Sequence, residues 1–401
     1  MDIVQRSARY HFASSNMSLA FCSFYKVNYL SFLTHPNMYL QRISLTNFKS
    51  YDFGDFKFSH RVNCIVGENG SGKTNLLDAI YFLALTKSSV STQDALCVTH
   101  EADFMMIDGL FVGGEKGDVQ ITCSFQKGQK KAVLHDKKPY EKISEHIGLY
   151  PVVLISPNDT DIVRDGSEER RKFFDGVISQ IDREYLETLI KYNKVLLQRN
   201  ALLKQFAEKN YFDADLLDIY SEPIIECGIE LQKKRAVFLS KFTPIFQKHY
   251  ANLSESREDV RLVYETDVDA DTFRNDFTKN RQRDLAAQRT TLGIHKDDFS
   301  FEINAFPLKK YGSQGQQKSY VIALKLAQFE LLALEKGFQP ILLLDDIFDK
   351  LDDRRIQQLI NMMVDGTFQQ VFLTDARPER TQQLLSHLTV EVLYFDVTQG
   401  K

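Results

Sequence analysis

The segment from residue 62 to residue 85 combines a strand, a glycine-rich loop and a helix. Val62–Val66 is a short, β-prone apolar run, and the apolar residues after the loop recur with helical spacing. The loop matches GxxxxGK[ST] and consists of Gly67, Glu68, Asn69, Gly70, Ser71, Gly72, Lys73 and Thr74. Glycines let backbone N–H groups surround phosphates, and the helix N-terminus adds the positive end of its dipole. The segment predicts an ATP-type nucleotide site in which Lys73 bridges the β- and γ-phosphates and Thr74 binds Mg²⁺. The alternative is a glycine turn that merely opens a helix.

A second apolar run, Ile341–Leu344, ends in the acids Asp345 and Asp346. Such a run is typical of a central parallel strand. We expect Asp345 to hold Mg²⁺, directly or through water, and Asp346 to act catalytically by orienting or deprotonating the attacking water. The alternative is a strand that ends in solvated acids, but a phosphate-binding loop in the same chain favours the catalytic interpretation.

A third motif lies between these two, at residues 311–319, and opens an apolar helix expected over residues 320–334. Ser313 and Gly315 there form another small-residue helix start, which is a second phosphate-reading geometry. Residues 67–74 already surround one nucleotide, so this element is predicted to read a nucleotide held by another subunit. A capped helix with glycines as a hinge is the alternative.

The composition limits the elements that can position these motifs. The chain has 401 residues, of which 43% are hydrophobic and 26% charged, so we expect a sizeable core in two or three domains or one elaborated domain. No run approaches the roughly 18 apolar residues of a membrane span, so no membrane association is expected. The net charge of −4 means that a nucleic-acid surface would be a local basic face. Five scattered cysteines without CxxC spacing argue against disulfides and a zinc cluster, and favour a reducing cytosol.

Residues 1–37 differ from the rest of the chain. Their only acid is Asp2, and they show no helical period, whereas strand-like alternation begins at Tyr39. We interpret them as a non-homologous leader upstream of a true start at Met38. A signal peptide or a transit peptide fits the segment less well.

The order of these motifs resembles that of ABC-type ATPases of the SMC group, and within that group the RecF family. The resemblance extends from Met38 to about Val397 and includes the segments LTNFKSY at 45–51, ISPND at 155–159, RRKFFD at 170–175, GIHKDD at 293–298 and GSQGQQ at 312–317. It implies an α/β fold: a P-loop ABC-type ATPase head with a compact, mainly helical second lobe inserted. The head would comprise residues 38–156 and 293–401, and the lobe residues 157–292.

The resemblance also implies site residues and a function. Ser313, Gly315 and Gln316 would form a signature that contacts ATP in trans, and residues 349–352 resemble the D-loop that crosses between subunits. Asp346 stands where many ABC ATPases have glutamate, which would make hydrolysis slow, and Thr374 stands where they often have a switch histidine. The family implies an ATP-dependent DNA-binding protein of DNA replication and recombinational repair. It would act in the cytoplasm as an ATP-induced homodimer in the SOS response to DNA damage.

The partners implied are duplex DNA and single-strand junctions, bound without sequence preference, and mediator proteins that help load a recombinase. A weak, DNA-stimulated ATPase activity would accompany binding. Basic residues of the helical insert are candidates for phosphate contacts: Lys191, Lys194, Arg199, Lys204, Lys209, Lys233, Lys234, Arg235, Arg281, Arg283 and Arg289. Solvated helix faces are the alternative, because acids are interspersed among them. His295 is either a nucleotide or DNA contact or a structural histidine.

The insert itself reads as mostly helical between residues 161 and 289. Pro223 and Pro244 are expected to interrupt it, and sustained heptads are missing, so we predict a compact lobe instead of a coiled-coil arm. Two other functions fit a nucleotide-binding head of this type. One is the ATPase subunit of a transport-type ABC system, and the other is a nucleotide-dependent scaffold without significant hydrolysis.

Overall fold

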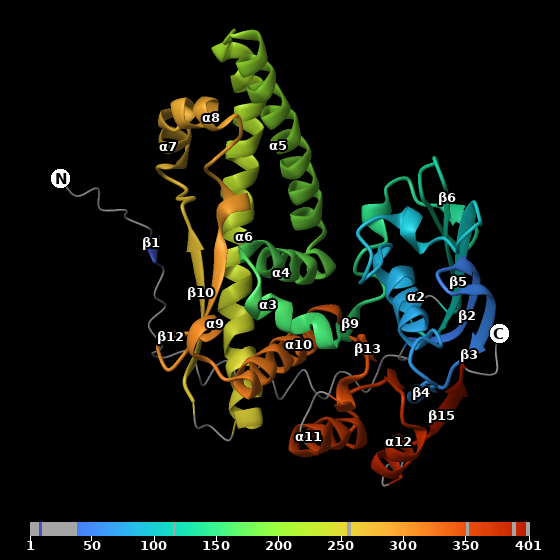
Figure 1. Ribbon diagram of the computed structural model, residues 1–401. Helices are drawn as coiled ribbons and strands as arrows, with labels where there is room; N and C mark the ends of the chain where they lie inside the picture. Colours follow the sequence, from blue (N-terminus) through green and yellow to red (C-terminus); the bar gives the residue numbers. More distant parts are fainter. Residues whose placement is uncertain are drawn as a thin grey trace. The chain divides into compact units, whose positions relative to one another are not determined.

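The computed structural model describes residues 8–9, 38–114, 117–254, 258–349, 353–386 and 390–397 (Figure 1). The described residues form two compact units: one takes its residues from 8–9 and 160–321, the other from 38–159 and 322–397. We call the first the helical unit and the second the P-loop unit. The described contacts group residues 293–321 with the helical unit, although the sequence analysis assigned them to the head. The predicted domain boundaries at 156/157 and 292/293 therefore differ from the division into compact units, and the domain assignment stays a prediction.

A five-stranded parallel sheet forms the centre of the P-loop unit. Its order is β15 (Val392–Asp396), β4 (Val62–Val66), β14 (Val371–Asp375), β13 (Ile341–Leu344) and β9 (Val152–Ile155), and all neighbours pair in parallel. Every residue of β4, β13 and β14 is buried. Burial on both faces explains why β13 is a continuous apolar run and why β4 and β14 are mostly apolar, as the sequence predicted for residues 62–66 and 341–344.

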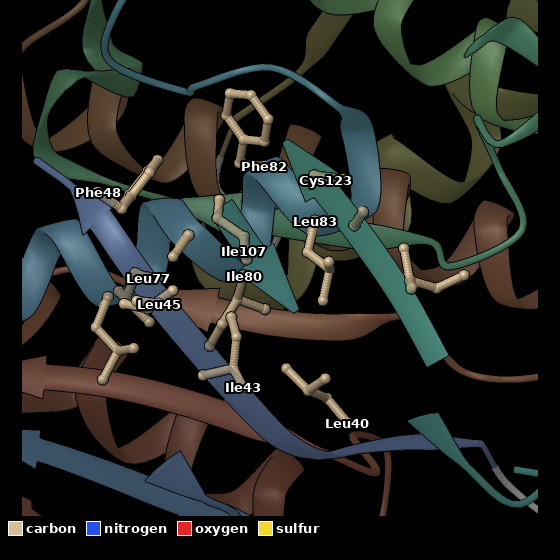
Figure 2. Packing of buried hydrophobic residues seen from close by; sticks show 14 of the residues in the cluster. Leu40, Ile43, Leu45, Phe48, Leu77, Ile80, Phe82, Leu83, Ile107 and Cys123 are labelled. Atoms are coloured by element: carbon tan, nitrogen blue, oxygen red, sulfur yellow. The ribbon is translucent and has the colours of Figure 1, made fainter. Parts of the chain in front are cut away.

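A six-stranded antiparallel sheet completes the layers of this unit, in the order β3-β2-β5-β6-β7-β8. The strands are β2 (Tyr39–Phe48), β3 (Tyr51–Lys57), β5 (Phe104–Val112), β6 (Val119–Gln126), β7 (Ala132–His135) and β8 (Lys138–Pro139). Its inward side chains pack with helix α2 (Lys73–Leu85), and Figure 2 shows Ile43 and Leu45 of β2 close to Leu77 and Ile80 of α2. This core fixes the helix that the glycine-rich loop opens.

Shorter elements cover the remaining described parts of the P-loop unit. They are η1 (Asp94–Cys97), η2 (Ile143–Glu145), η3 (Pro157–Thr160), η5 (Ile347–Asp349), α11 (Asp353–Val364) and α12 (Pro378–Leu385). Helix α10 (Gln314–Lys336) begins in the helical unit, and the division between the units falls within it. It confirms the apolar helix expected at residues 320–334 and starts six residues earlier.

The helical unit contains a four-stranded antiparallel sheet beside its helices. The sheet order is β1 (Ala8–Arg9), β10 (Val260–Thr266), β11 (Asp298–Ile303) and β12 (Phe306–Pro307). The other elements are α3 (Asp161–Arg164), α4 (Ser167–Ile181), α5 (Arg183–Lys209), α6 (Ala214–Ser254), α7 (Phe273–Lys279), α8 (Arg281–Ala287), η4 (Ile294–Lys296) and α9 (Leu308–Tyr311). The mostly helical insert is thus confirmed, but the strand β10 within it was not predicted. Of the predicted leader, only Ala8 and Arg9 lie among the described residues, where they pair with β10.

Helices α5 and α6 run side by side and dominate the helical unit (Figure 1). Helix α6 has 41 residues and continues through Pro223 and Pro244. The predicted interruption is therefore wrong. A proline in a helix interior costs about 3 kcal/mol, whereas each fully buried large apolar side chain contributes about 1.5–3 kcal/mol. Helix α6 buries Leu231, Phe242 and Phe246 completely, so tertiary packing outweighs the local cost.

Candidate nucleotide site

The glycine-rich loop has the backbone geometry that phosphate binding requires. Gly67, Gly70 and Gly72 have φ angles of 153°, 82° and 110°, a region that side chains with a Cβ rarely adopt. Gly72 also caps α2, and a Cβ there would lie 2.9 Å from Ser50 Oγ and 3.1 Å from Tyr51 Oη. Glycine at position 72 is thus required both by the backbone angle and by the space.

The Lys73 side chain folds back over this loop. It is 4% exposed, and Nζ donates hydrogen bonds to the carbonyl oxygens of Gly67 at 2.9 Å and Glu68 at 3.0 Å. Ser71 Oγ is buried and has no hydrogen-bond partner within the described residues. A buried hydroxyl without a partner is costly, and a phosphate oxygen would supply the missing partner. The loop, the ammonium group and this hydroxyl therefore fit a nucleotide polyphosphate.

Thr74 and Asp345 come together although 271 residues separate them. Thr74 Oγ1 donates to Asp345 Oδ1 at 3.0 Å, and Thr374 Oγ1 donates to the same oxygen at 2.8 Å. Burial raises the pKa of Asp345, and the two threonine hydroxyls oppose that rise. A hydroxyl and a carboxylate are oxygen ligands of the kind that Mg²⁺ takes at nucleotide sites. The residues predicted to hold Mg²⁺ are thus adjacent.

Asp346 begins the turn after β13 with a φ of 45°. Its backbone N–H donates to Thr374 Oγ1 at 2.9 Å. The single hydroxyl of Thr374 therefore holds both acids, donating to the side chain of Asp345 and accepting from the backbone of Asp346. From the sequence, Thr374 was recognised only as the residue in place of a switch histidine, because nothing in the local pattern shows which strand lies beside β13.

Side chains at the turn between β2 and β3 contact the glycine-rich loop and helix α2. Tyr51 Oη donates to the Gly72 carbonyl oxygen at 3.1 Å, and burial raises the pKa of Tyr51 to about 12, which keeps the hydroxyl protonated. Lys49 Nζ lies 2.6 Å from the buried carboxylate of Asp78 in α2. These side chains were not predicted as part of the site, although they belong to the segment 45–51 that carries the family resemblance.

The signature residues form a capping box at the start of α10. Ser313 Oγ accepts from the Gln316 backbone N–H at 3.2 Å, and Gln316 Oε1 accepts from the Ser313 N–H at 2.6 Å. Gln316 Nε2 also donates to Glu258 at 2.7 Å. Ser313 is exposed, and Gly315 lies in the first turn. The capped-helix alternative thus describes the local structure, and contact with ATP in trans stays a prediction.

Two of the predicted DNA-facing arginines are buried instead. Arg199 is 1% exposed and pairs with Asp284 at 2.8 Å, while Arg235 is 1% exposed and pairs with Asp175 at 2.9 Å and Asp297 at 2.8 Å. The prediction that these two arginines face DNA is wrong, since a buried guanidinium engaged by carboxylates cannot reach a phosphate.

Two other predicted DNA-facing residues are paired at the surface of the helical unit. Lys234 lies 2.8 Å from Asp182, and Arg281 lies 2.6 Å from Asp218. The remaining seven are exposed: Lys191, Lys194, Lys204, Lys209, Lys233, Arg283 and Arg289.

His295 is a structural residue in this fold. Its Nδ1 lies 2.7 Å from Tyr192 Oη, and its Nε2 lies 3.1 Å from the Thr290 carbonyl oxygen. Burial lowers the pKa of His295 to about 4, so the ring is neutral at pH 7.

Within the described ranges no group of three or more His, Cys, Asp or Glu side chains could hold a metal ion. Three residues of the D-loop segment, 350–352, lie outside the described residues.

Comparison with known proteins identifies the family. Residues 39–394 match the RecF/RecN/SMC N-terminal domain. A protein of Flavobacterium johnsoniae named DNA replication and repair protein RecF is 47% identical over 357 residues, which cover 88% of this chain and 99% of that protein. The chain belongs to the RecF family. A RecF protein of Cytophaga hutchinsonii is also 47% identical, with 91% of this chain and 96% of that protein covered.

Solved RecF structures share the fold over most of the chain. The recombination mediator protein RecF with ATP, from the RecFOR pathway, has a TM-score of 0.82 at 29% identity and covers 91% of this chain and 97% of its own. The ATPrS form has a TM-score of 0.79 at 31% identity and covers 86% and 94%. An Smc head of Pyrococcus furiosus at 18% identity and a TM-score of 0.51, covering 89% of this chain and 93% of its own, shares the fold alone.

These relationships confirm the predicted α/β ABC-type ATPase fold and the RecF resemblance. As a member of the RecF family, the chain is an ATP-binding protein of DNA replication and repair. In the described part of the chain no helix is long and apolar enough to cross a membrane.

Proposed function

We propose that the chain is an ATP-dependent DNA-binding protein of recombinational repair and replication, in which ATP brings two copies together as a dimer. The contact between Thr74 and Asp345 carries this proposal. It joins the glycine-rich loop near one end of the P-loop unit's sequence to the acid-ending strand near the other, and so assembles the elements of a nucleotide site. Membership of the RecF family, with its recombination mediator structures, supports the DNA role.

The nucleotide polyphosphate would lie along the loop of residues 67–74. Lys73 Nζ, which bonds to two loop carbonyl oxygens, would turn to the β- and γ-phosphates, and Ser71 Oγ would gain the partner it lacks. Thr74 and Asp345 would hold Mg²⁺, which neutralises phosphate charge when bound. Asp346 would orient or deprotonate the attacking water. Its shorter side chain supports slow hydrolysis, hence a weak, DNA-stimulated ATPase.

The second copy would complete each site through Ser313, Gly315 and Gln316. The exposed Ser313 hydroxyl and the N–H groups of the first turn of α10 are suited to a phosphate held by a partner. Within this proposal the protein binds duplex DNA and single-strand junctions without sequence preference. It cooperates with mediator proteins in recombinase loading, and acts in the cytoplasm during the SOS response to DNA damage.

Light scattering of the full chain with ATP and with a short duplex tests the proposal. The expected result is a mass that doubles with ATP and a dimer that retains DNA. Lys73→Ala should abolish both effects, because the cation that offsets the phosphate charge is lost. A wild-type chain that stays monomeric with ATP and ignores DNA contradicts the proposal. A dimer that releases no phosphate would indicate a nucleotide-dependent scaffold.

Contact in trans is tested separately with Ser313→Arg. This variant should bind ATP as a monomer yet fail to dimerise, whereas the control Ser240→Arg, at an exposed serine of α6, should dimerise normally. Mixing Ser313→Arg with Lys73→Ala leaves one composite site with both halves intact, so partial ATP-dependent heterodimer formation is expected. If Ser313→Arg dimerises like the wild type, the signature does not act across a dimer interface.

A further inference from the structure

Residues 293–298, the segment GIHKDD, have a single exposed member. Within this fully described segment Lys296 is the exposed residue, and the other five are buried or half-buried. Asp297 pairs with Arg235 inside the helical unit, Asp298 pairs with Arg170 of α4 at 2.7 Å, and the neutral ring of His295 is held by hydrogen bonds. The segment is therefore fixed from within and presents one ammonium group to solvent.

Two arginines, Arg171 and Arg289, are near enough for their charges to act on this lysine. Arg171 of α4 donates to the carbonyl oxygen of Asp297, the next residue after Lys296, at 2.6 Å. On the other side, the Thr290 carbonyl oxygen lies 3.1 Å from His295 Nε2, which brings the exposed Arg289 back toward Lys296. Hydrogen bonds on both flanks thus hold the Arg171 guanidinium and the backbone next to Arg289 against the segment that carries Lys296.

The positive charges around Lys296 are not balanced by carboxylates. Partial burial lowers the pKa of Lys296, and Arg289 and Arg171 lower it further, without an acid among the groups that act on it. Among the described residues, no carboxylate forms an ion pair with any of these three side chains. The acids whose charges act on Arg171 are already engaged, Asp298 by Arg170, and Asp297 and Asp175 by Arg235. Like charges held together repel one another unless an anion binds between them.

We propose that Arg171, Arg289 and Lys296 form a binding site for a backbone phosphate of duplex DNA. This inference rests on the proposed DNA-binding function and locates a contact for it. Two guanidinium groups and an ammonium group match phosphate oxygens without reading bases, as binding without sequence preference requires. ATP phosphates share this chemistry, but the glycine-rich loop and Lys73 already supply donors for them, so DNA is the ligand assigned to the cluster.

Fluorescence anisotropy of the ATP-bound full chain with a labelled duplex, at several salt concentrations, tests the site. Lys296→Gln and Arg289→Gln should each weaken binding about fivefold or more at low salt, and each should reduce the slope of log K against log salt by about 0.9. Both residues are exposed, so thermal melting should be unchanged. Lys279→Gln, at an exposed lysine that ends α7, is the matched control and should bind DNA like the wild type.

Three results would overturn the site. The first is DNA binding by both variants with wild-type affinity and salt slope. The second is an equal loss in Lys279→Gln, which would show a general charge effect. The third is a loss of ATP affinity, measured without DNA, which would assign the cluster to nucleotide phosphates. If the wild-type protein binds no DNA in the presence of ATP, the proposed function itself is contradicted, and this outcome is distinct from the other three.

Discussion

Replacing Thr374 by valine should loosen both acids of the nucleotide site at once. Thr374 is 1% exposed, and its hydroxyl donates to Asp345 and accepts from the backbone N–H of Asp346. Valine has nearly the same shape but neither donates nor accepts a hydrogen bond. The substitution therefore removes two interactions without opening a cavity.

The size of the effect follows from those two bonds. A hydrogen bond to a charged group contributes about 1.5–3 kcal/mol, and a buried N–H left without a partner costs about 1–3 kcal/mol. Thr74 still donates to Asp345, and local rearrangement can admit water to the Asp346 N–H, so we expect a loss of about 2–4 kcal/mol rather than the full sum. For a unit of this size, that corresponds to a fall in melting temperature of about 4–16 °C.

Thr374→Ser provides the matched control, since it retains the hydroxyl and loses only a methyl group, with an expected cost of about 1 kcal/mol. Urea unfolding of both variants, followed by circular dichroism, measures the difference, and ATP titration should show weaker binding for Thr374→Val alone. Equal stabilities of the valine and serine variants would refute the reasoning, because the hydroxyl would then contribute nothing.

Other consequences of the structure can be measured in the same way. Asp345→Asn should weaken Mg²⁺-dependent ATP binding about tenfold or more, whereas Asp346→Asn should leave binding intact and slow phosphate release about 10²-fold or more; equal loss of binding in both variants would contradict the assigned roles. Arg235→Met should cost about 3–5 kcal/mol in thermal or urea unfolding, because it leaves two carboxylates unpaired in the helical unit, and a cost under about 1 kcal/mol would show that they find other partners. Burial lowers the pKa of His146 and of His295 to about 4, below the value of 6.5 for an unfolded chain. The folded protein therefore has its full stability above pH 6.5, and the contribution of these neutral rings is lost as the pH falls through 4. Each contributes up to about 3 kcal/mol to that loss, and His146→Gln should flatten the profile of unfolding free energy against pH between 7 and 4; an unchanged profile would show that this ring does not cause the loss.

Several parts of the site were predictable because they depend on neighbouring residues. The glycine-rich loop needs an apolar strand before it, a helix after it and glycines where φ is positive, and all three features lie within residues 62–85. The strand Ile341–Leu344 contains only apolar residues, which predicts that it is buried, and the two acids follow it directly in the sequence. Local patterns of this kind encode local conformation, so their interpretation needed no knowledge of distant contacts.

Other features became visible only with the tertiary structure. From the sequence, Arg199 and Arg235 were predicted to be exposed residues that contact DNA. Both are buried instead, because each forms ion pairs with carboxylates from other elements. Pro223 signals a helix break, but the apolar face of α6 packs so extensively that the helix continues.

The function of Thr374 likewise required knowing that β14 pairs with β13. By itself the sequence determined the phosphate-binding loop, the acid-ending strand and the family. The tertiary structure decided which charges are paired and buried and which, such as Lys296, face solvent. The physical reason is that the free energy of a charged group depends on the partners and the water around it, and a folded chain draws those partners from residues far apart in its sequence.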